Sequence, residues 1–198
     1  MHEHHHASHH EPRDIADAYA EAIAEFRRRK DQAFAAGPQS PLLPADRPRF
    51  RGLTYFPPDL RYRFEGLPLG PYTGHEPLDF VMQTSDGQPR PARRVGTFRL
   101  ELDGRPLELH AYGFEGSDPD SLFVPFMDAT SGHETYEAGR YLDLEPEDDG
   151  SYVLDFNLAY HPLCVYSPYY SCPLPPAENR LPVRIEAGEM LPEGIGGH

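Results

Sequence analysis

Apolar residues recur every three or four positions between residues 13 and 36, whereas beyond residue 50 they alternate with polar residues in short segments. The first pattern places the apolar side chains on one stripe of an α-helix. The stripe comprises Ile15, Tyr19, Ala22, Ile23, Phe26, Ala33 and Phe34. Pro12 suits the first turn of this helix, and Gly37 suits its end. We therefore predict one amphipathic helix over residues 13–36.

The alternating segments predict β-strands. The clearest signal is a hairpin at 98–109, in which Asp103 and Gly104 supply the positive φ angles of a tight type I′ turn. His110 continues the polar side of the second strand, so we expect it to be exposed. Further strands are expected at 60–65, 78–83, 121–126, 139–144, 151–160 and 181–187. The fold predicted is mostly β, a small antiparallel barrel or two-sheet sandwich with one N-terminal α-helix.

The length of 198 residues and a hydrophobic content of 38% suit one core and therefore one domain. We place this domain at residues 13–189, with its β-rich part at 50–189. Residues 1–12 contain six histidines and are expected to form a disordered tail, native or partly an added tag. Residues 190–198 are expected to form a flexible tail.

The charge balance argues against two classes of partner. The chain has 18 basic and 32 acidic residues, a formal net charge of −14, and such a surface repels nucleic acids and anionic membranes. Lys30 is its single lysine, and the acidic composition is typical of proteins from salt-loving microbes. No apolar run is long enough to cross a membrane or to act as a secretory signal. We expect a cytoplasmic protein with reduced thiols, and the sequence indicates no cofactor or oligomeric state.

Residues 161–181 hold both cysteines, Cys164 and Cys172, among several prolines. One interpretation is a metal site with His161 and His133, although seven residues separate the thiols where zinc knuckles leave about two to four. A second is a nucleophilic Cys164 with His161 as base and Asp155 or Glu178 as the orienting carboxylate. The third, which we favour, is that both cysteines pack as small apolar side chains. A disulfide is disfavoured in a reducing compartment.

Five sequence motifs, taken in this order, indicate a family: KDQAF (30–34), FRGLTYFPPD (50–59), PFMDATSGHETYEAGRYLDL (125–144), LDFNLAYHPLCVYS (154–167) and SCPLPPAENRLPVRIEAGE (171–189). Together they resemble the family called domain of unknown function 1684. The resemblance implies a standalone prokaryotic domain with its distinguishing residues in the C-terminal half, and it implies no particular reaction. At the position of His161 that family usually has asparagine, and the positions of Met127 and Leu158 are often basic. His161 is therefore not a group on which the whole family relies.

Polar residues of the C-terminal half are the candidates for binding. Ser131 and Glu134 form a capping-box pattern that predicts a short helical turn. Arg140 either forms a structural ion pair or presents its planar guanidinium to an anionic ligand. Asp155 and Asn157 share one side of the strand expected at 151–160, where they either orient a polar ligand or satisfy buried backbone groups.

The function predicted is a small-molecule binding module. Its pocket would lie between the strand 151–160, the loop 128–141 and the segment with the two cysteines. The ligand residues expected are Tyr136, Arg140, Asp155, Asn157, Tyr160, Tyr166, Glu178 and Asn179. Two alternatives stay open: an enzyme that uses Cys164 as a nucleophile or a cysteine and histidine metal site, and a structural or partner-binding domain without a pocket. Whether the protein is an enzyme is not decided by the sequence.

Overall fold

The computed structural model describes residues 12–195, so the tail expected at 1–12 lies outside it apart from its last residue. The helix α1 (Pro12–Ala36) confirms the helical prediction. It ends at Gly37, whose amide donates to the carbonyl of Ala33 (2.9 Å). A Cβ atom on Gly37 would lie 2.4 Å from that carbonyl oxygen, which is why glycine suits this end.

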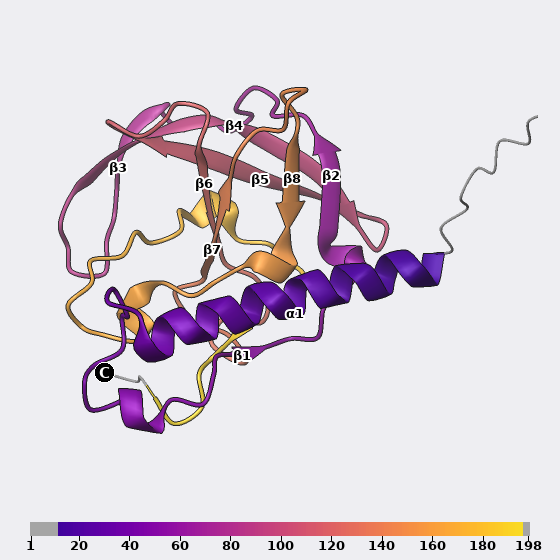
Figure 1. Ribbon diagram of the computed structural model, residues 1–198. Coiled ribbons are helices and arrows are strands. Elements are labelled where there is room, and N and C mark those ends of the chain that lie inside the picture. The colour runs from indigo at the N-terminus through magenta and orange to yellow at the C-terminus, as the bar shows by residue number, and fades with distance from the viewer. Residues whose placement is uncertain (1–11, 196–198) are drawn as a thin grey trace, which may run out of the picture.

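A five-stranded antiparallel sheet, in the order β3-β4-β5-β6-β7, forms the centre of the domain (Figure 1). Its strands are β3 (Asp79–Met82), β4 (Arg90–Leu102), β5 (Arg105–Phe114), β6 (Leu122–Phe126) and β7 (Arg140–Leu144). Two small sheets pair β2 (Arg63–Leu67) with β8 (Tyr152–Asp155), and β1 (Thr54–Tyr55) with β9 (Glu189–Met190). The mostly β fold class with one N-terminal helix is thereby confirmed, as a curled half-barrel sheet.

The hairpin of β4 and β5 was predicted correctly. Leu102 pairs with Arg105 across a turn in which Asp103 has φ 50° and Gly104 has φ 76°. Glycine and aspartate tolerate these left-handed angles, which match the twist of the two strands. The expected strands at 78–83, 121–126 and 139–144 are also present.

The two faces of the five-stranded sheet bury different clusters. The inner face packs against β2 and β8 and forms the main core with residues such as Phe98, Leu109, Val124, Leu142 and Leu154. The outer face carries an aromatic cluster that comprises Met82, Ala92, Tyr112, Phe123 and Tyr141, with Phe80, Phe114 and Tyr160 against it. A third cluster joins Phe34 of α1 to Tyr166, Phe50 and Ile195.

Three strand predictions need correction. The first three residues of 60–65 form the 3-10 helix η2 (Leu60–Tyr62), which Asp59 caps by accepting from Arg61 N. The strand expected at 151–160 stops at Asp155, because this side chain accepts from the amide of Asn157 (2.9 Å) and starts the 3-10 helix η3 (Phe156–Leu158). Further short 3-10 helices are η1 (Arg47–Arg49), η4 (Leu163–Val165) and η5 (Ala177–Asn179).

The segment 181–187 forms no strand. Its backbone amides form hydrogen bonds with the segment 127–128: Leu181 N donates to Met127 O (2.8 Å), and Ile185 N donates to the carboxylate of Asp128 (2.7 Å). These bonds take the place of the regular backbone hydrogen bonds to a neighbouring strand that would define a β-strand.

Part of the segment 190–198, which was expected to be a flexible tail, belongs to the folded domain. Met190 belongs to β9, and Ile195 is buried beside Phe34. Residues 196–198 lie outside the described part of the chain.

Within residues 12–195, no helix combines the length and the apolar composition needed to span a bilayer.

Candidate functional site

An open cleft of about 860 Å³ lies on the outer face of the sheet. We call it the outer cleft. Its walls are the second half of α1, the outer sides of β5, β6 and β7, and residues 170–173 of the segment with the two cysteines. Figure 1 shows α1 running across the ends of the strands, with the C-terminal segment beneath it. Elements far apart in the sequence therefore build one concave surface.

Eight aromatic side chains line the outer cleft. They are Phe26 and Phe34 of α1, Tyr112, Phe114, Phe123 and Tyr141 of the sheet, and Tyr160 and Tyr170 beyond it. The rings contact one another edge to face, as Phe123 and Tyr141 do at 4.7 Å between centroids. Ligand pockets are typically this apolar, with a few polar groups that fix orientation.

The charged groups at the outer cleft are mostly basic. Arg90 lies over the ring of Phe114 at 3.8 Å, and it has no ion-pair partner among the described residues. Lys30 pairs with the buried carboxylate of Glu189 and lies 4.9 Å from the ring of Tyr160. Asp143, the acidic residue in the lining, accepts a hydrogen bond from the Tyr160 hydroxyl. Arg90 is thus the basic group left free to meet a ligand anion.

A second cleft of about 870 Å³ lies beside the first and shares Gly113, Phe114 and Ser117 with it. Two of its lining residues, Tyr72 and Arg94, donate to Glu178, which itself lines neither cleft. Glu178 accepts hydrogen bonds from Arg94 Nε (2.7 Å) and from the Tyr112 hydroxyl (2.7 Å). These donors, with the Tyr72 hydroxyl, lower the pKa of Glu178 against the opposing effect of burial. Because Glu178 is already saturated with donors, its role here is structural.

The neighbouring Asn179 is fully buried. Its side chain accepts from the amide of His110 and donates to the carbonyls of His110 and Pro125, each at 2.8 Å. It therefore joins η5 to the strands β5 and β6 rather than facing a ligand. The prediction that His110 is exposed was wrong: it is 6% exposed, covered by the ring of Tyr72 and bonded to Thr97 (2.8 Å).

Cys164 and Cys172 contact each other, and Cys172 lines the outer cleft. The amide of Cys164 donates to the sulfur of Cys172 (3.3 Å), and the amide of Cys172 donates to the hydroxyl of Ser85 (3.0 Å). A hydrogen bond from the Cys172 thiol lowers the pKa of Cys164 to about 7, with further help from Ser85 and Tyr136 against burial. Both cysteines are free thiols.

The two ring nitrogens of His161 face Tyr136 and Glu189 rather than Cys164. Its Nε2 accepts the amide proton of Tyr136 (3.1 Å), and its Nδ1 lies 3.7 Å from Glu189 without a hydrogen bond. Burial, with the nearby Arg140 and Lys30, lowers the pKa of His161 to about 3. The side chain is therefore neutral at physiological pH and belongs to a buried polar layer under α1. Tyr166 lies in the same layer, 1% exposed, with its hydroxyl bonded to Glu189 (3.3 Å).

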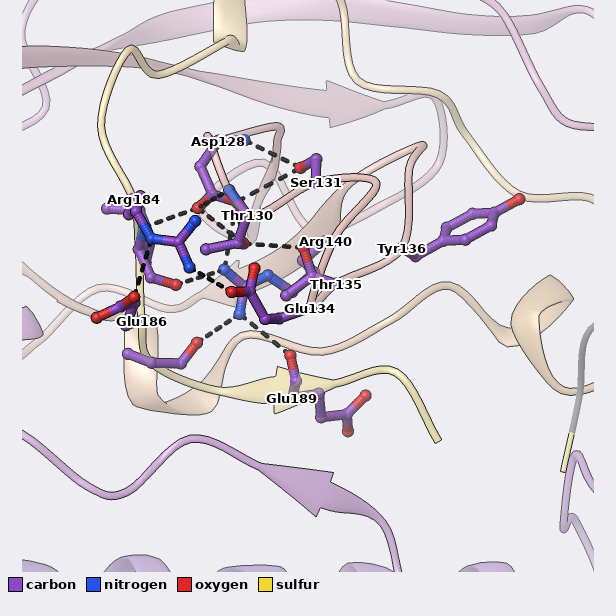
Figure 2. A network of polar contacts seen from close by, with 12 residues as sticks. Asp128, Thr130, Ser131, Glu134, Thr135, Tyr136, Arg140, Arg184, Glu186 and Glu189 are labelled. Carbon is purple, nitrogen blue, oxygen red and sulfur yellow. Dashed lines mark hydrogen bonds and ion pairs between the residues drawn. The ribbon is translucent and has the colours of Figure 1, made fainter. Parts of the chain in front are cut away.

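Arg140 is fully buried and serves the fold (Figure 2). Its guanidinium donates to the carbonyls of Ala187, Glu189 (3.2 Å) and Ile185 (2.8 Å), and it pairs with Asp128 at 3.4 Å. The structural alternative for Arg140 is the one that the contacts support. The ligand role would require an exposed face that the side chain lacks.

The loop 128–139 contains turns instead of the helical turn expected from its capping-box pattern. The carboxylate of Asp128 accepts hydrogen bonds from the amides of Thr130 and Ile185. Glu134 does not cap a helix but forms an ion pair with Arg184 (Figure 2). Tyr136 points away from this network, toward Cys164.

Asp155 and Asn157 also hold elements together. Asp155 accepts from the hydroxyl of Tyr19 (2.8 Å) and from Arg63 (3.0 Å), which ties α1 to β2. Asn157 exchanges two hydrogen bonds with the backbone of Asp59 (2.8 and 2.9 Å). Both residues are 2% exposed, so they satisfy buried groups and line neither cleft.

The predicted site residues are thus distributed over several networks. Tyr160 and Cys172 line the outer cleft, whereas the other predicted ligand residues line neither cleft. The metal candidates do not gather either: His133 is exposed on its loop, and within residues 12–195 no three His, Cys, Asp or Glu side chains are placed to hold a metal ion. The sequence analysis missed Arg90, Phe114 and Phe123. The signal for Phe123 was β6 itself, whose residues are apolar on both faces.

The curled sheet, the helix across its end and the cleft between them define a β half-barrel domain with one N-terminal helix. Residues 48–190 match the family described as "Protein of unknown function (DUF1684)", and the chain belongs to this family. It is similar to an uncharacterized protein from Haloarcula marismortui, solved by solution NMR, with 38% sequence identity and a TM-score of 0.63. That match covers 89% of this chain and 96% of the other. No match was found among curated proteins.

Proposed function

We propose that the protein binds a small molecule in the outer cleft, and that this ligand has a flat apolar body and an anionic group. The observation that carries the proposal is a cleft of about 860 Å³ lined by eight aromatic side chains. Its volume falls within the range of about 300 to 1,000 Å³ typical of small-molecule sites.

The anionic group is inferred from Arg90. This side chain is exposed and has no ion pair among the described residues, although the chain carries 32 acidic residues. Its stacking on Phe114 at 3.8 Å holds the guanidinium at the cleft. A guanidinium fixed in this way presents two parallel donors to a carboxylate, sulfonate or phosphate.

The apolar body is inferred from the rings behind Arg90. Phe114 and Phe123 are 5.3 Å apart, and Tyr141 continues the row toward the thiols. A flat ligand that covers these rings would remove apolar surface from water, at about 25 cal/mol per Å². Of these rings Phe114 is half-buried, whereas Phe123 and Tyr141 are 8% and 5% exposed, so the ligand would lie mainly on Phe114.

The test uses 8-anilinonaphthalene-1-sulfonate as a flat anionic probe. We expect saturable binding with one site per chain, observed as a fluorescence increase with the folded protein. The uncharged 1-anilinonaphthalene should bind about tenfold more weakly, because it lacks the group that Arg90 recognises.

Two variants locate the probe. Arg90→Met should weaken the sulfonate about tenfold and leave the uncharged probe unaffected. Arg99→Met is the matched control, because Arg99 is an exposed arginine of the same strand that lines neither cleft. Equal affinity of both variants for the sulfonate would refute recognition at Arg90, and lack of saturable binding would refute the site.

A further inference from the structure

We infer that Cys164 and Cys172 form a peroxide-reactive thiol pair, in which Cys164 is oxidised first and Cys172 then closes an intramolecular disulfide. This inference does not depend on what the outer cleft binds. It follows from the contact between the Cys164 amide and the Cys172 sulfur and from the different exposure of the two thiols.

The backbone holds the two cysteines against each other. After η4 (Leu163–Val165) the chain turns back, so that the Cys164 amide reaches the Cys172 sulfur at 3.3 Å. Cys172 is fixed from the other side by Ser85, whose amide donates to the Cys172 carbonyl (2.8 Å) and whose hydroxyl accepts from the Cys172 amide (3.0 Å). The next residues continue this link, since Leu174 N donates to Gln83 O (2.8 Å).

The donors around the pair make the two thiols unequal. Cys172 lowers the pKa of Cys164 to about 7, with smaller contributions from Ser85 and Tyr136 and against the effect of burial. The hydrogen bond to Cys164 and burial raise the pKa of Cys172. Cys164 therefore carries the thiolate, while Cys172 keeps its proton until it is needed.

Access favours a small oxidant. Cys164 is partly exposed, and Cys172 is 5% exposed but lines the outer cleft. A hydroperoxide is small enough to reach both sulfurs, and nothing in the chemistry requires a metal.

The reaction balances with a hydroperoxide as the oxidant. The Cys164 thiolate attacks one peroxide oxygen, the O–O bond breaks, and the leaving alkoxide or hydroxide takes the proton that Cys164 released. The product is a sulfenic acid on Cys164. The Cys172 sulfur then attacks the Cys164 sulfur, the S–O bond breaks, and hydroxide leaves as water with the Cys172 proton. Two thiols lose two electrons, and the peroxide is reduced by two electrons.

The experiment treats the full chain with one equivalent of hydrogen peroxide and measures intact mass and free thiols. We expect a product about 2 Da lighter, without free thiols, that a dithiol reductant reverses. Cys172→Ser should stop at a sulfenic acid on Cys164 that dimedone traps. Cys164→Ser should not react in the time that the wild type needs for complete oxidation. Circular dichroism checks that both variants fold.

The pH dependence separates this pair from ordinary thiols. The pH dependence is measured on the wild type, because Cys172→Ser removes the thiol that lowers the pKa of Cys164. The rate of alkylation of the wild type by iodoacetamide should have a midpoint near pH 7 rather than about 8.5. At pH 7 its peroxide reaction should be about threefold faster than in the unfolded chain, because the gain in thiolate exceeds the loss of intrinsic nucleophilicity. Tyr136→Phe should move the midpoint upward without loss of fold.

Three results would overturn the inference. One is a midpoint near pH 8.5 in the wild type, and another is equal peroxide rates for Cys164→Ser and Cys172→Ser. The third is a product that is a disulfide-linked dimer, since the proposed bond lies within one chain.

Discussion

On the inner face of the five-stranded sheet, Phe98, Leu109 and Leu142 are each no more than 2% exposed, whereas on the outer face Phe80, Phe114 and Tyr160 stay partly exposed. Leu109 and Phe114 even lie on the same strand, β5, because successive side chains of a strand point to opposite sides. The inner face is closed by β2 and β8, and it is filled. The outer face is covered only in part, and a cleft remains there.

Buried polar groups also differ between the two sides. On the inner side, the Arg140 guanidinium makes bonds to three carbonyls and to Asp128, and only its Nε has no hydrogen-bond partner. Under α1, the Tyr55 hydroxyl, two nitrogens of Arg27 and His161 Nδ1 have no hydrogen-bond partner within the described chain. Four of the six unpaired buried side-chain atoms of the described residues thus lie under α1, and we expect the inner face to contribute more to stability.

The largest effect should come from the inner side, at Asp128. Asp128→Ala leaves the Arg140 charge, the Ile185 amide and the Thr130 hydroxyl without their buried acceptor. We expect the free energy of unfolding to fall by about 3 to 5 kcal/mol, measured by urea denaturation. Asp143→Ala is the control at the outer cleft and should cost about 1 kcal/mol or less. Similar losses for both variants would contradict the division between the faces.

A pair of variants on β5 tests the two faces directly. Leu109→Ala removes a fully buried side chain of the inner face and should cost about 2 to 5 kcal/mol. Phe114→Ala removes a larger but partly exposed ring of the outer face, and we expect it to cost only about 1 kcal/mol. Phe114→Ala should also reduce binding of the anilinonaphthalene sulfonate, measured by fluorescence titration, whereas Leu109→Ala should not. If Phe114→Ala costs as much stability as Leu109→Ala, the outer face is a second core.

Local patterns predicted those elements that local interactions define. The helix and the β4–β5 hairpin depend on periodicity and on one turn, and both are present. The expected strands at 151–160 and 181–187 failed for one common reason. Side chains of Asp155, Asp128 and Arg140 bind the backbone there, and alternation of apolar residues carries no information about such bonds.

The site was less predictable than the fold. Sequence reasoning selected polar residues because polar groups in a C-terminal half suggest binding, yet Asp155, Asn157, Asn179 and Arg140 are buried in structural networks. The outer cleft is formed by α1 and three strands that the chain brings together only in three dimensions. Proximity in sequence did bring Cys164 to Cys172, because the turn between them is local.

An effect smaller than that of Asp128→Ala concerns the polar layer under α1 and depends on pH. Because burial holds the pKa of His161 at about 3, below the value of about 6.5 in an unfolded chain, the unfolded state binds more protons between these two values. The stability that neutral His161 contributes is complete above pH 6.5 and is lost as the pH falls toward 3. Between pH 7.5 and pH 5, the free energy of unfolding should decrease by about 2 kcal/mol more in the wild type than in His161→Gln.

The glutamine variant is a suitable reference because its side-chain oxygen can accept the Tyr136 amide proton that His161 Nε2 now accepts, without titrating. Urea denaturation at several pH values between 7.5 and 5 measures the difference, and this window lies above the titration of most carboxylates. Burial also lowers the pKa of His110. Because His110 is present in both proteins, its contribution to the pH dependence cancels in the comparison. Parallel pH profiles for the two proteins would mean that His161 accepts a proton in the folded state. The unpaired Nδ1 beside Glu189 would then be a protonated partner of that carboxylate.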